Sequence, residues 1–264
     1  MKKATLLPVL GMALFGVAAA LTAAPVEAKE WKTVRIGMDA TYPPFESVNA
    51  KGEIVGWEVD YAREICKRMK VECTFQNQDW DGIIPSLLAG KFDMIMSSMN
   101  ITAARKERVN FSDFYFSTPP VFLGTASYKG EITPAALKGK TIGTQSSTTF
   151  ANYLEKFYKD SQIKLYPSGD EPHIDLASGR IDFAVTDVIV ASTFVEKNPA
   201  CCKIAGEIDR AKHVDVFGPG VGAALRKEDT VLLAMVNKAI AEVDADGTFK
   251  KIADQYFKVN IRGK

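Results

Sequence analysis

The sequence has 264 residues, of which 47% are hydrophobic and 25% are charged, with a formal net charge of +1 at neutral pH. This composition is ordinary for a globular protein, and the length is enough for one large domain or two small ones. The near balance of charges argues against a nucleic-acid-binding protein and against a polybasic membrane-surface protein.

The first 28 residues have the pattern of a secretory signal peptide. Lys2 and Lys3 precede an apolar stretch over residues 6–24, and Val26-Glu27-Ala28 supplies small residues where a signal peptidase cuts. A membrane anchor is the alternative, but this stretch is rich in Ala and Gly and ends in a processing site. We therefore expect cleavage near Ala28 and an exported mature protein. Its net charge is then close to zero, because two lysines and one glutamate are removed.

The four cysteines of an exported chain are expected to form disulfides. Cys66 lies near the end of a helical pattern and Cys73 near the start of the next strand, so a Cys66–Cys73 bridge would close a short loop. Cys201 and Cys202 are adjacent, and the sequence leaves open whether they are free, joined to each other or joined elsewhere. Zinc is the weaker alternative, because neither of the two histidines has ligand spacing to the cysteines. No metal or other cofactor is expected.

Strand and helix patterns alternate along the first half of the mature chain. The expected elements are a strand over residues 34–38, a helix over 58–70, a strand over 71–75, a helix over 82–89 and a strand over 92–96. The first helix would bury Tyr61, Ile65 and Met69 on one face. This alternation predicts the α/β class, with a largely parallel sheet covered by helices.

An internal repeat indicates two similar lobes. Residues 87–98, LLAGKFDMIMSS, align with residues 176–187, LASGRIDFAVTD. Both segments read as a helix end, a glycine cap, a basic residue, an Asp, a buried strand and a polar end. A repeat this long is not a solenoid period. A further strand over residues 141–143, followed by a helix from Ser147, makes a chance match less credible.

Ligands of open α/β sheets bind beyond the carboxyl ends of the strands. The repeat places Ser97 and Ser98 at such an end in one lobe and Asp187 at the equivalent end in the other. Two facing lobes would aim these residues at a shared cleft. Other polar clusters at strand ends and helix starts lie at residues 39–45, 79–82, 100–105 and 145–149.

The chemistry of these clusters fits a zwitterionic ligand. An Arg and free N–H groups at a helix start suit a carboxylate. A carboxylate suits an ammonium group, and aromatic faces suit a flat or cationic side chain. Each residue also has a simpler explanation. Asp39 could cap a turn, Ser147, Thr148 and Asp187 could cap helices, and Arg105 could lie on a solvated helix face. Tyr42 and Trp80 could be packed aromatic rings.

Longer motifs give the mature chain a resemblance to a known family. The most specific are IGMDATYPPF at residues 36–45, GWEVD at 56–60, IPSL at 84–87, SSMNIT at 97–102 with Arg105, and residues 218–227. The chain resembles the solute-binding proteins, family 3, of ABC amino-acid importers. It is most similar to the branch that binds lysine, arginine, ornithine and histidine, with opine-binding proteins nearby. The Cys66–Cys73 pair matches a bridge of that branch.

The resemblance implies the two-lobed periplasmic binding protein fold (type II), with the ligand cleft between the lobes. Residues 29–118 and 219–264 would form lobe 1, and residues 119–218 would form lobe 2. Two crossings, near residues 117–123 and 216–221, would act as hinges while the lobes stay rigid.

The resemblance also implies how the groups common to all amino acids would be held. Arg105, helped by backbone N–H groups near Thr148, would pair with the ligand α-carboxylate. Asp187 and the carbonyl of Ser98 would accept the α-ammonium group.

The ligand side chain would meet a different set of residues. Tyr42 and Trp80 would sandwich it, and Asp39 would accept a hydrogen bond from its basic end. Two departures from the family leave the exact ligand open: Asn100 stands where Ser or Thr is commoner, and Ser146 replaces a common Gly. The remaining ligand-binding positions implied by the resemblance are Ser97, Asn100 and Ser147.

The sequence thus predicts the periplasmic substrate-binding component of an ABC amino-acid importer. It would act as a monomer and not as an enzyme, closing on a free basic amino acid that it delivers to a membrane permease. Glutamine or an opine is the alternative ligand. A periplasmic cyclohexadienyl dehydratase on the same fold is the alternative from another class, and it would need a general acid such as Asp39 or Asp187 in the cleft.

Overall fold

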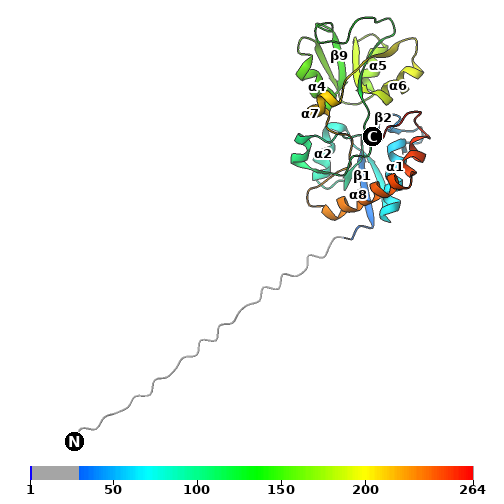
Figure 1. Cartoon of the computed structure of the whole chain (residues 1–264). Coiled ribbons are helices and arrows are strands. Elements are labelled where there is room, and N and C mark those ends of the chain that lie inside the picture. The colour runs from blue at the N-terminus through cyan, green and yellow to red at the C-terminus, as the bar shows by residue number, and fades with distance from the viewer. Residues whose placement is uncertain (2–29, 264) are drawn as a thin grey trace.

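The computed structural model describes Met1 and residues 30–263, so the predicted signal peptide and its cleavage near Ala28 lie outside the described residues. The described chain forms two lobes, each built on a five-stranded sheet (Figure 1). We call the lobe that contains β1 (Thr33–Met38) lobe 1 and the lobe that contains β9 (Thr141–Gln145) lobe 2. No helix of the described residues is long and apolar enough to cross a membrane.

Lobe 1 has the strand order β5-β1-β6-β13-β7, in which β1 is parallel to β5 and β6, and β13 is antiparallel to β6 and β7. Its other strands are β5 (Glu72–Asn77), β6 (Met94–Ile95), β7 (Asn110–Phe111) and β13 (Ala224–Leu225). A small second sheet contains β2 (Thr41–Tyr42), β3 (Glu46–Val48) and β4 (Ile54–Val55). The helices are α1 (Trp57–Met69), α2 (Trp80–Leu88), α3 (Ala103–Arg108), α8 (Thr230–Ala245) and α9 (Thr248–Ala253).

Lobe 2 repeats this pattern with the strand order β10-β9-β11-β8-β12. Strand β9 is parallel to β10 and β11, and β8 is antiparallel to β11 and β12. Its other strands are β8 (Pro120–Thr125), β10 (Gln162–Tyr166), β11 (Phe183–Asp187) and β12 (Cys202–Glu207). Its helices are α4 (Thr149–Phe157), α5 (Glu171–Ala177), α6 (Val188–Lys197) and α7 (Val214–Phe217), with the 3-10 turn η1 (Ala211–His213) before α7.

The predicted repeat is confirmed in both backbone and side chains. Gly90 and Gly179 end equivalent helices, and both have φ of 73°, a left-handed conformation that favours glycine. The Asp of each copy then accepts a hydrogen bond from the neighbouring strand: Asp93 from Arg35 N at 3.1 Å and Asp182 from Thr141 N at 2.8 Å. The same sequence pattern therefore joins a helix to a parallel strand in both lobes.

The apolar face predicted for the first helix is buried. Tyr61 and Ile65 of α1 are fully buried, and Met69 is 9% exposed. Trp57 stacks on Tyr61 with ring centroids 5.2 Å apart, and the pair packs with residues of α8 and α9 in one core. Burying each such side chain stabilises the fold by about 1.5–3 kcal/mol.

Two connections join the lobes, one between β7 and β8 and one between α7 and β13. They lie side by side, because Val221 forms antiparallel bridges with both Asn100 and Phe116. The predicted crossings extended too far into lobe 2. Residues 120–123 belong to β8, since this apolar run completes the sheet, and Val216 and Phe217 belong to α7. The boundaries after residues 118 and 218 fall within the two connections and stay predictions.

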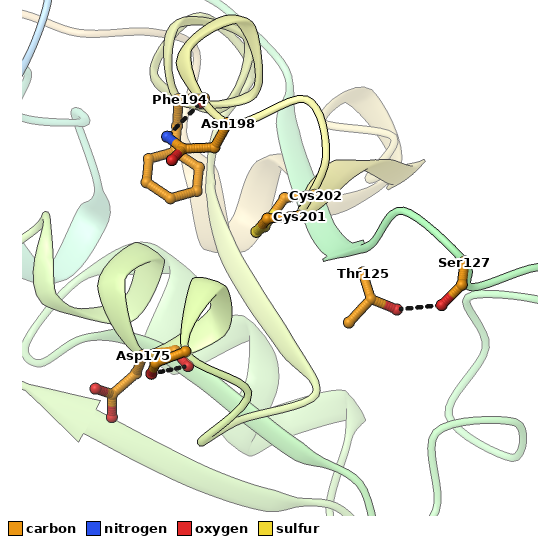
Figure 2. Close-up of a disulfide and its surroundings, with 8 residues drawn as sticks. Thr125, Ser127, Asp175, Phe194, Asn198, Cys201 and Cys202 are labelled. Atoms are coloured by element: carbon orange, nitrogen blue, oxygen red, sulfur yellow. Dashed lines mark hydrogen bonds between the residues drawn. A yellow bond between two sulfur atoms is a disulfide. The ribbon is translucent and has the colours of Figure 1, made fainter.

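All four cysteines are paired within the described residues. The predicted Cys66–Cys73 disulfide is confirmed and links the end of α1 to β5. Cys201 and Cys202, which the sequence left open, are joined to each other at the start of β12 (Figure 2). Among the described residues, no group of three or more His, Cys, Asp or Glu side chains could hold a metal ion.

Candidate functional site

One cavity lies where strand ends and helix starts of the two lobes face each other. It contains almost the whole predicted site: Asp39, Tyr42, Trp80, Ser97, Ser98, Asn100 and Arg105 from lobe 1, and Thr148 and Asp187 from lobe 2. Ser147 does not line this cavity, but its carbonyl oxygen accepts from Trp80 Nε1 at 3.1 Å and from Arg105 Nη2 at 3.3 Å. The cavity therefore combines two guanidinium groups, those of Arg105 and Arg210, with carboxylates and aromatic faces drawn from both lobes.

Arg105 is positioned by the start of α3. Thr102 caps this helix by accepting from Arg105 N at 3.3 Å, and Arg105 Nη1 donates to Asn100 O at 2.9 Å. The guanidinium lies over the Trp80 ring, 5.2 Å from its centroid, a distance suited to a cation–π contact. Burial lowers the pKa of Arg105 to about 10, which leaves it charged at neutral pH. A charged Arg beside the start of α4 is suited to a carboxylate.

Asp187 ends β11 and caps α6. Its Oδ1 accepts from Ile189 N at 2.8 Å, and its Oδ2 accepts from Thr118 Oγ1. Burial raises the pKa of Asp187 to about 6, against the opposing effects of these hydrogen bonds and of nearby Arg210. The side chain is 7% exposed and mostly anionic at neutral pH. It is therefore both a helix cap, as the simpler explanation had it, and an anion lining the cavity.

Asp39 is a second buried carboxylate, 5% exposed, at the end of β1. It accepts from Gln145 Nε2 at 2.6 Å and from Thr41 Oγ1 at 2.9 Å. Burial raises the pKa of Asp39, as do the charges of Asp79 and Asp170, whereas the two hydrogen bonds lower it. A cationic group in the cavity would stabilise the charged form of this carboxylate.

Ser97 and Ser98 are held by hydrogen bonds to two buried glutamates. Ser97 Oγ accepts from Asp39 N at 2.8 Å and donates to Glu46 Oε1 at 3.1 Å. Ser98, at φ of 50°, donates from both N and Oγ to Glu58 Oε2 at 2.8 Å. Burial and the neighbouring Glu58 hold the pKa of Glu46 well above its usual range.

The lobes also contact each other directly around the cavity. Tyr42 Oη of lobe 1 accepts from Asp187 N at 3.2 Å and lies 3.2 Å from Thr186 Oγ1. Thr41 Oγ1 accepts from Gly169 N at 3.0 Å. These contacts describe a closed cleft, in which groups of each lobe reach the other.

The sequence did not single out several residues that line the cavity: Glu46, Phe116, Thr118, Gln145, Thr149, Phe150, Arg210 and Val221. Gln145 and Thr149 carried a signal, because they belong to the polar cluster at residues 145–149. Arg210 carried none, because the charged segment around it reads as a solvated surface. Glu46 follows a Pro-Pro-Phe turn, and its burial depends on the packing of β3 against α1.

The sequence matches a model of the bacterial extracellular solute-binding proteins, family 3, over residues 34–259. The chain belongs to this family. Its similarity extends to the ABC transporter arginine-binding protein 1 of Escherichia coli (strain K12), 37% identical over 258 residues, covering 97% of this chain and 99% of the relative. It is also similar to the lysine/arginine/ornithine-binding periplasmic protein of the same strain, 39% identical over 244 residues, covering 92% of this chain and 94% of the relative.

The family's solved structures share this fold. An ancestral arginine-binding protein bound to arginine superposes with a TM-score of 0.79 at 37% sequence identity, covering 85% of this chain and 98% of that one. The structure therefore confirms the two-lobed α/β fold predicted from the sequence. Both curated relatives named above are binding proteins.

Proposed function

We propose that this protein is the periplasmic component of an ABC importer and binds one free basic amino acid between its lobes. The observation that carries the proposal is the charge arrangement of a single cavity. Arg105 supplies a cation, Asp187 supplies an anion from the opposite lobe, and Asp39 supplies a second buried carboxylate. The first two match the zwitterion of any amino acid, and the third matches a cationic side chain. The names of the two curated relatives point to the same ligands.

The α-groups of the ligand are assigned to both lobes. Arg105 pairs with the α-carboxylate, together with the backbone N–H groups that the first turn of a helix leaves without intrahelical partners, here near Thr148. Asp187 and the Ser98 carbonyl accept the α-ammonium group. Because these groups come from both lobes, the full set of contacts forms only when the cleft is closed.

The ligand side chain is assigned to the lobe 1 side of the cavity. Tyr42 and Trp80 flank it, and Asp39 accepts a hydrogen bond from its basic end. Ser97 lines the cavity, and Ser147 acts through its carbonyl, which holds Trp80 and Arg105 in place.

Closure of the two lobes is the conformational change by which the protein would report bound ligand to its permease. Binding shifts the population toward the closed form, which a membrane permease would recognise while the ligand stays chemically unchanged. The protein acts as a monomer in the periplasm, after removal of the signal peptide near Ala28.

A thermal-shift screen over the amino acids and opines tests the proposal. Lysine, arginine, ornithine or histidine at millimolar concentration should raise the melting temperature by mass action on the folded state. Glutamate and aspartate should not, because their side chains would face Asp39. An acidic amino acid giving the largest shift would overturn the assignment. Turnover of prephenate or arogenate would instead make the protein a dehydratase, with Asp187 (pKa about 6) as its general acid.

A further inference from the structure

Both ends of the Asn100 side-chain amide are bonded to lobe 2. Arg210 Nη2 donates to Asn100 Oδ1 at 2.5 Å, and Asn100 Nδ2 donates to Thr149 Oγ1 at 3.0 Å. A guanidinium has only donors, so Arg210 determines which end of the amide is the oxygen. Asn100 is 8% exposed, and Thr149 is 2% exposed. A buried amide of lobe 1 is thus satisfied on both sides by groups of the opposite lobe.

Arg210 is held by the lobe 2 ends of both connections. Its Nη1 donates to Thr118 O at 3.1 Å, just before β8, and its Nη2 donates to Phe217 O at 2.9 Å, where α7 ends. Its own backbone lies between β12 and η1 in lobe 2. These bonds make the guanidinium part of lobe 2, and Asn100 is its contact with lobe 1.

Thr149 is also positioned by its own lobe. It is the first residue of α4, a helix whose start is fixed by the cap in which Thr148 Oγ1 accepts from Ala151 N at 3.1 Å. The two partners of the Asn100 amide are therefore set in place by lobe 2 contacts that do not involve lobe 1.

We propose that Asn100, Thr149 and Arg210 form a closure latch, in which the Asn100 amide inserts between the other two side chains when the lobes close. The latch rests on the hinge closure of the proposed function. It stabilises the closed form from the wall of the ligand cavity, through one neutral and one charge-assisted hydrogen bond. Asn100 and Arg210 are then positioning residues, and they set the affinity for every ligand by setting the fraction of molecules that is ready to bind.

The distance between the lobes in ligand-free protein tests the latch. Spin labels are placed on the exposed Lys91 of lobe 1 and Lys159 of lobe 2 through an unnatural amino acid, because the natural cysteines are paired. We expect a closed subpopulation in the ligand-free protein that Asn100→Ser, Thr149→Val and Arg210→Lys each remove. Saturating arginine should restore the closed distance in all three. The Arg210→Lys variant keeps the positive charge beside Asp187, so its effect reports the lost geometry.

Affinity supplies the second measurement. Asn100→Ser should weaken arginine and lysine binding by the same factor, about tenfold, or about 1.4 kcal/mol. In the double variant with Thr149→Val, the loss should be less than the product of the single losses. Asn198→Ser is the matched control and should change neither readout, because in the described part of the chain its side-chain amide bonds only Phe194 O, within lobe 2, at 2.9 Å.

Identical ligand-free distance distributions for wild type and Asn100→Ser would overturn the latch. So would losses that multiply independently, which would make Asn100 a direct ligand contact. The distance measurement needs no ligand, so it separates failure of the latch from failure of the amino-acid assignment. If no amino acid binds but the closed subpopulation depends on Asn100, the latch stands and the proposed function fails.

Discussion

Gln145 of lobe 2 donates from Nε2 to Asp39 Oδ2 of lobe 1 at a distance of 2.6 Å. The same nitrogen donates to Pro167 O at 3.2 Å, which fixes the amide with its nitrogen toward the carboxylate. Gln145 and Thr41 are neutral donors, so they stabilise the anion without cancelling its charge. This relationship leaves Asp39 able to discriminate among ligands by the charge of their side chains.

Asp39→Asn keeps an acceptor but removes the charge, so it should mainly erase the preference for arginine over glutamine. A charge-assisted hydrogen bond contributes about 1.5–3 kcal/mol, equivalent to about tenfold to a hundredfold in relative affinity. Calorimetric titrations of both ligands on one protein give this ratio, in which any loss of stability largely cancels. Equal losses for arginine and glutamine would make Asp39 structural. Asp170→Asn is the control, because its charge acts on Asp39 only from a distance.

Arg105→Ala should weaken the binding of every amino-acid ligand by about 2–5 kcal/mol, as expected for a buried partner of a charged group. The melting temperature of the ligand-free protein should change little, because within the described residues the Arg105 guanidinium hydrogen-bonds only the carbonyls of Asn100 and Ser147 and otherwise lies over the Trp80 ring. Arg108→Ala is the matched control, since Arg108 ends the same helix and is exposed. Equal ligand affinities of Arg105→Ala and Arg108→Ala would indicate that Arg105 does not contact the ligand and belongs to a solvated helix face.

The affinity for arginine should fall as the pH is lowered through about 6. The pKa of Asp187 is raised to about 6, so below that pH its carboxyl is neutral and loses its attraction for the α-ammonium group. Above that pH the affinity should level off. Titrations from about pH 5 to about pH 8 should show this step in wild type and not in Asp187→Asn, which binds more weakly throughout. A step of equal size in both proteins would assign it to another group.

The Asp187 carboxyl should affect the stability of the ligand-free protein in the opposite direction to its effect on affinity. Folding raises the pKa of Asp187, so its protonated form stabilises the folded state. This contribution to the free energy of unfolding is fully present below the ordinary pKa of 3.8 and is lost as the pH rises through about 6. Denaturant unfolding at a series of pH values should show a smaller loss of stability across this window for Asp187→Asn than for wild type.

Gly169→Ala should hinder closure of the cleft. A Cβ there would lie 3.0 Å from Tyr42 Cδ2 and 3.2 Å from Thr41 O, both of the opposite lobe. Closure must then push these atoms aside, so the affinity for all basic amino acids should fall by one common factor. The stability of the ligand-free protein should stay unchanged, since the crowding is between lobes. An unchanged affinity would mean that the lobes close less tightly here than the structure shows.

The α/β pattern and the repeat were predictable because each element carries a local signal. Gly90 and Gly179 are examples, since their position between a helix and a strand already indicates a left-handed cap. The extent of the crossings was not predictable in the same way. Residues 121–123 are apolar in either case, and only their pairing with β11 and β12 places them in a sheet.

The candidate site also contains some residues that local sequence signals predict and others that depend on tertiary contacts. Arg105 and Asp187 lie at helix and strand ends, so the topology alone brings them to the cleft. Arg210 lies in a charged segment after β12 and is half-buried, where its guanidinium donates to Thr118 O and Asn100 Oδ1 from distant parts of the chain and to Phe217 O seven residues further on. A residue whose role depends on two long-range partners, here Thr118 and Asn100, leaves no periodic or local signal in the sequence.

Calorimetric titration of protein that has been unfolded and refolded to remove any carried-over ligand tests basic-amino-acid binding most directly. Arginine, lysine, ornithine or histidine should bind with a stoichiometry of one, and the Arg105→Ala variant should bind the same ligand far more weakly. Glutamate under the same conditions should give no saturable heat, because Asp39 repels its side chain. Glutamate binding more tightly than every basic amino acid would contradict the assignment of the cleft.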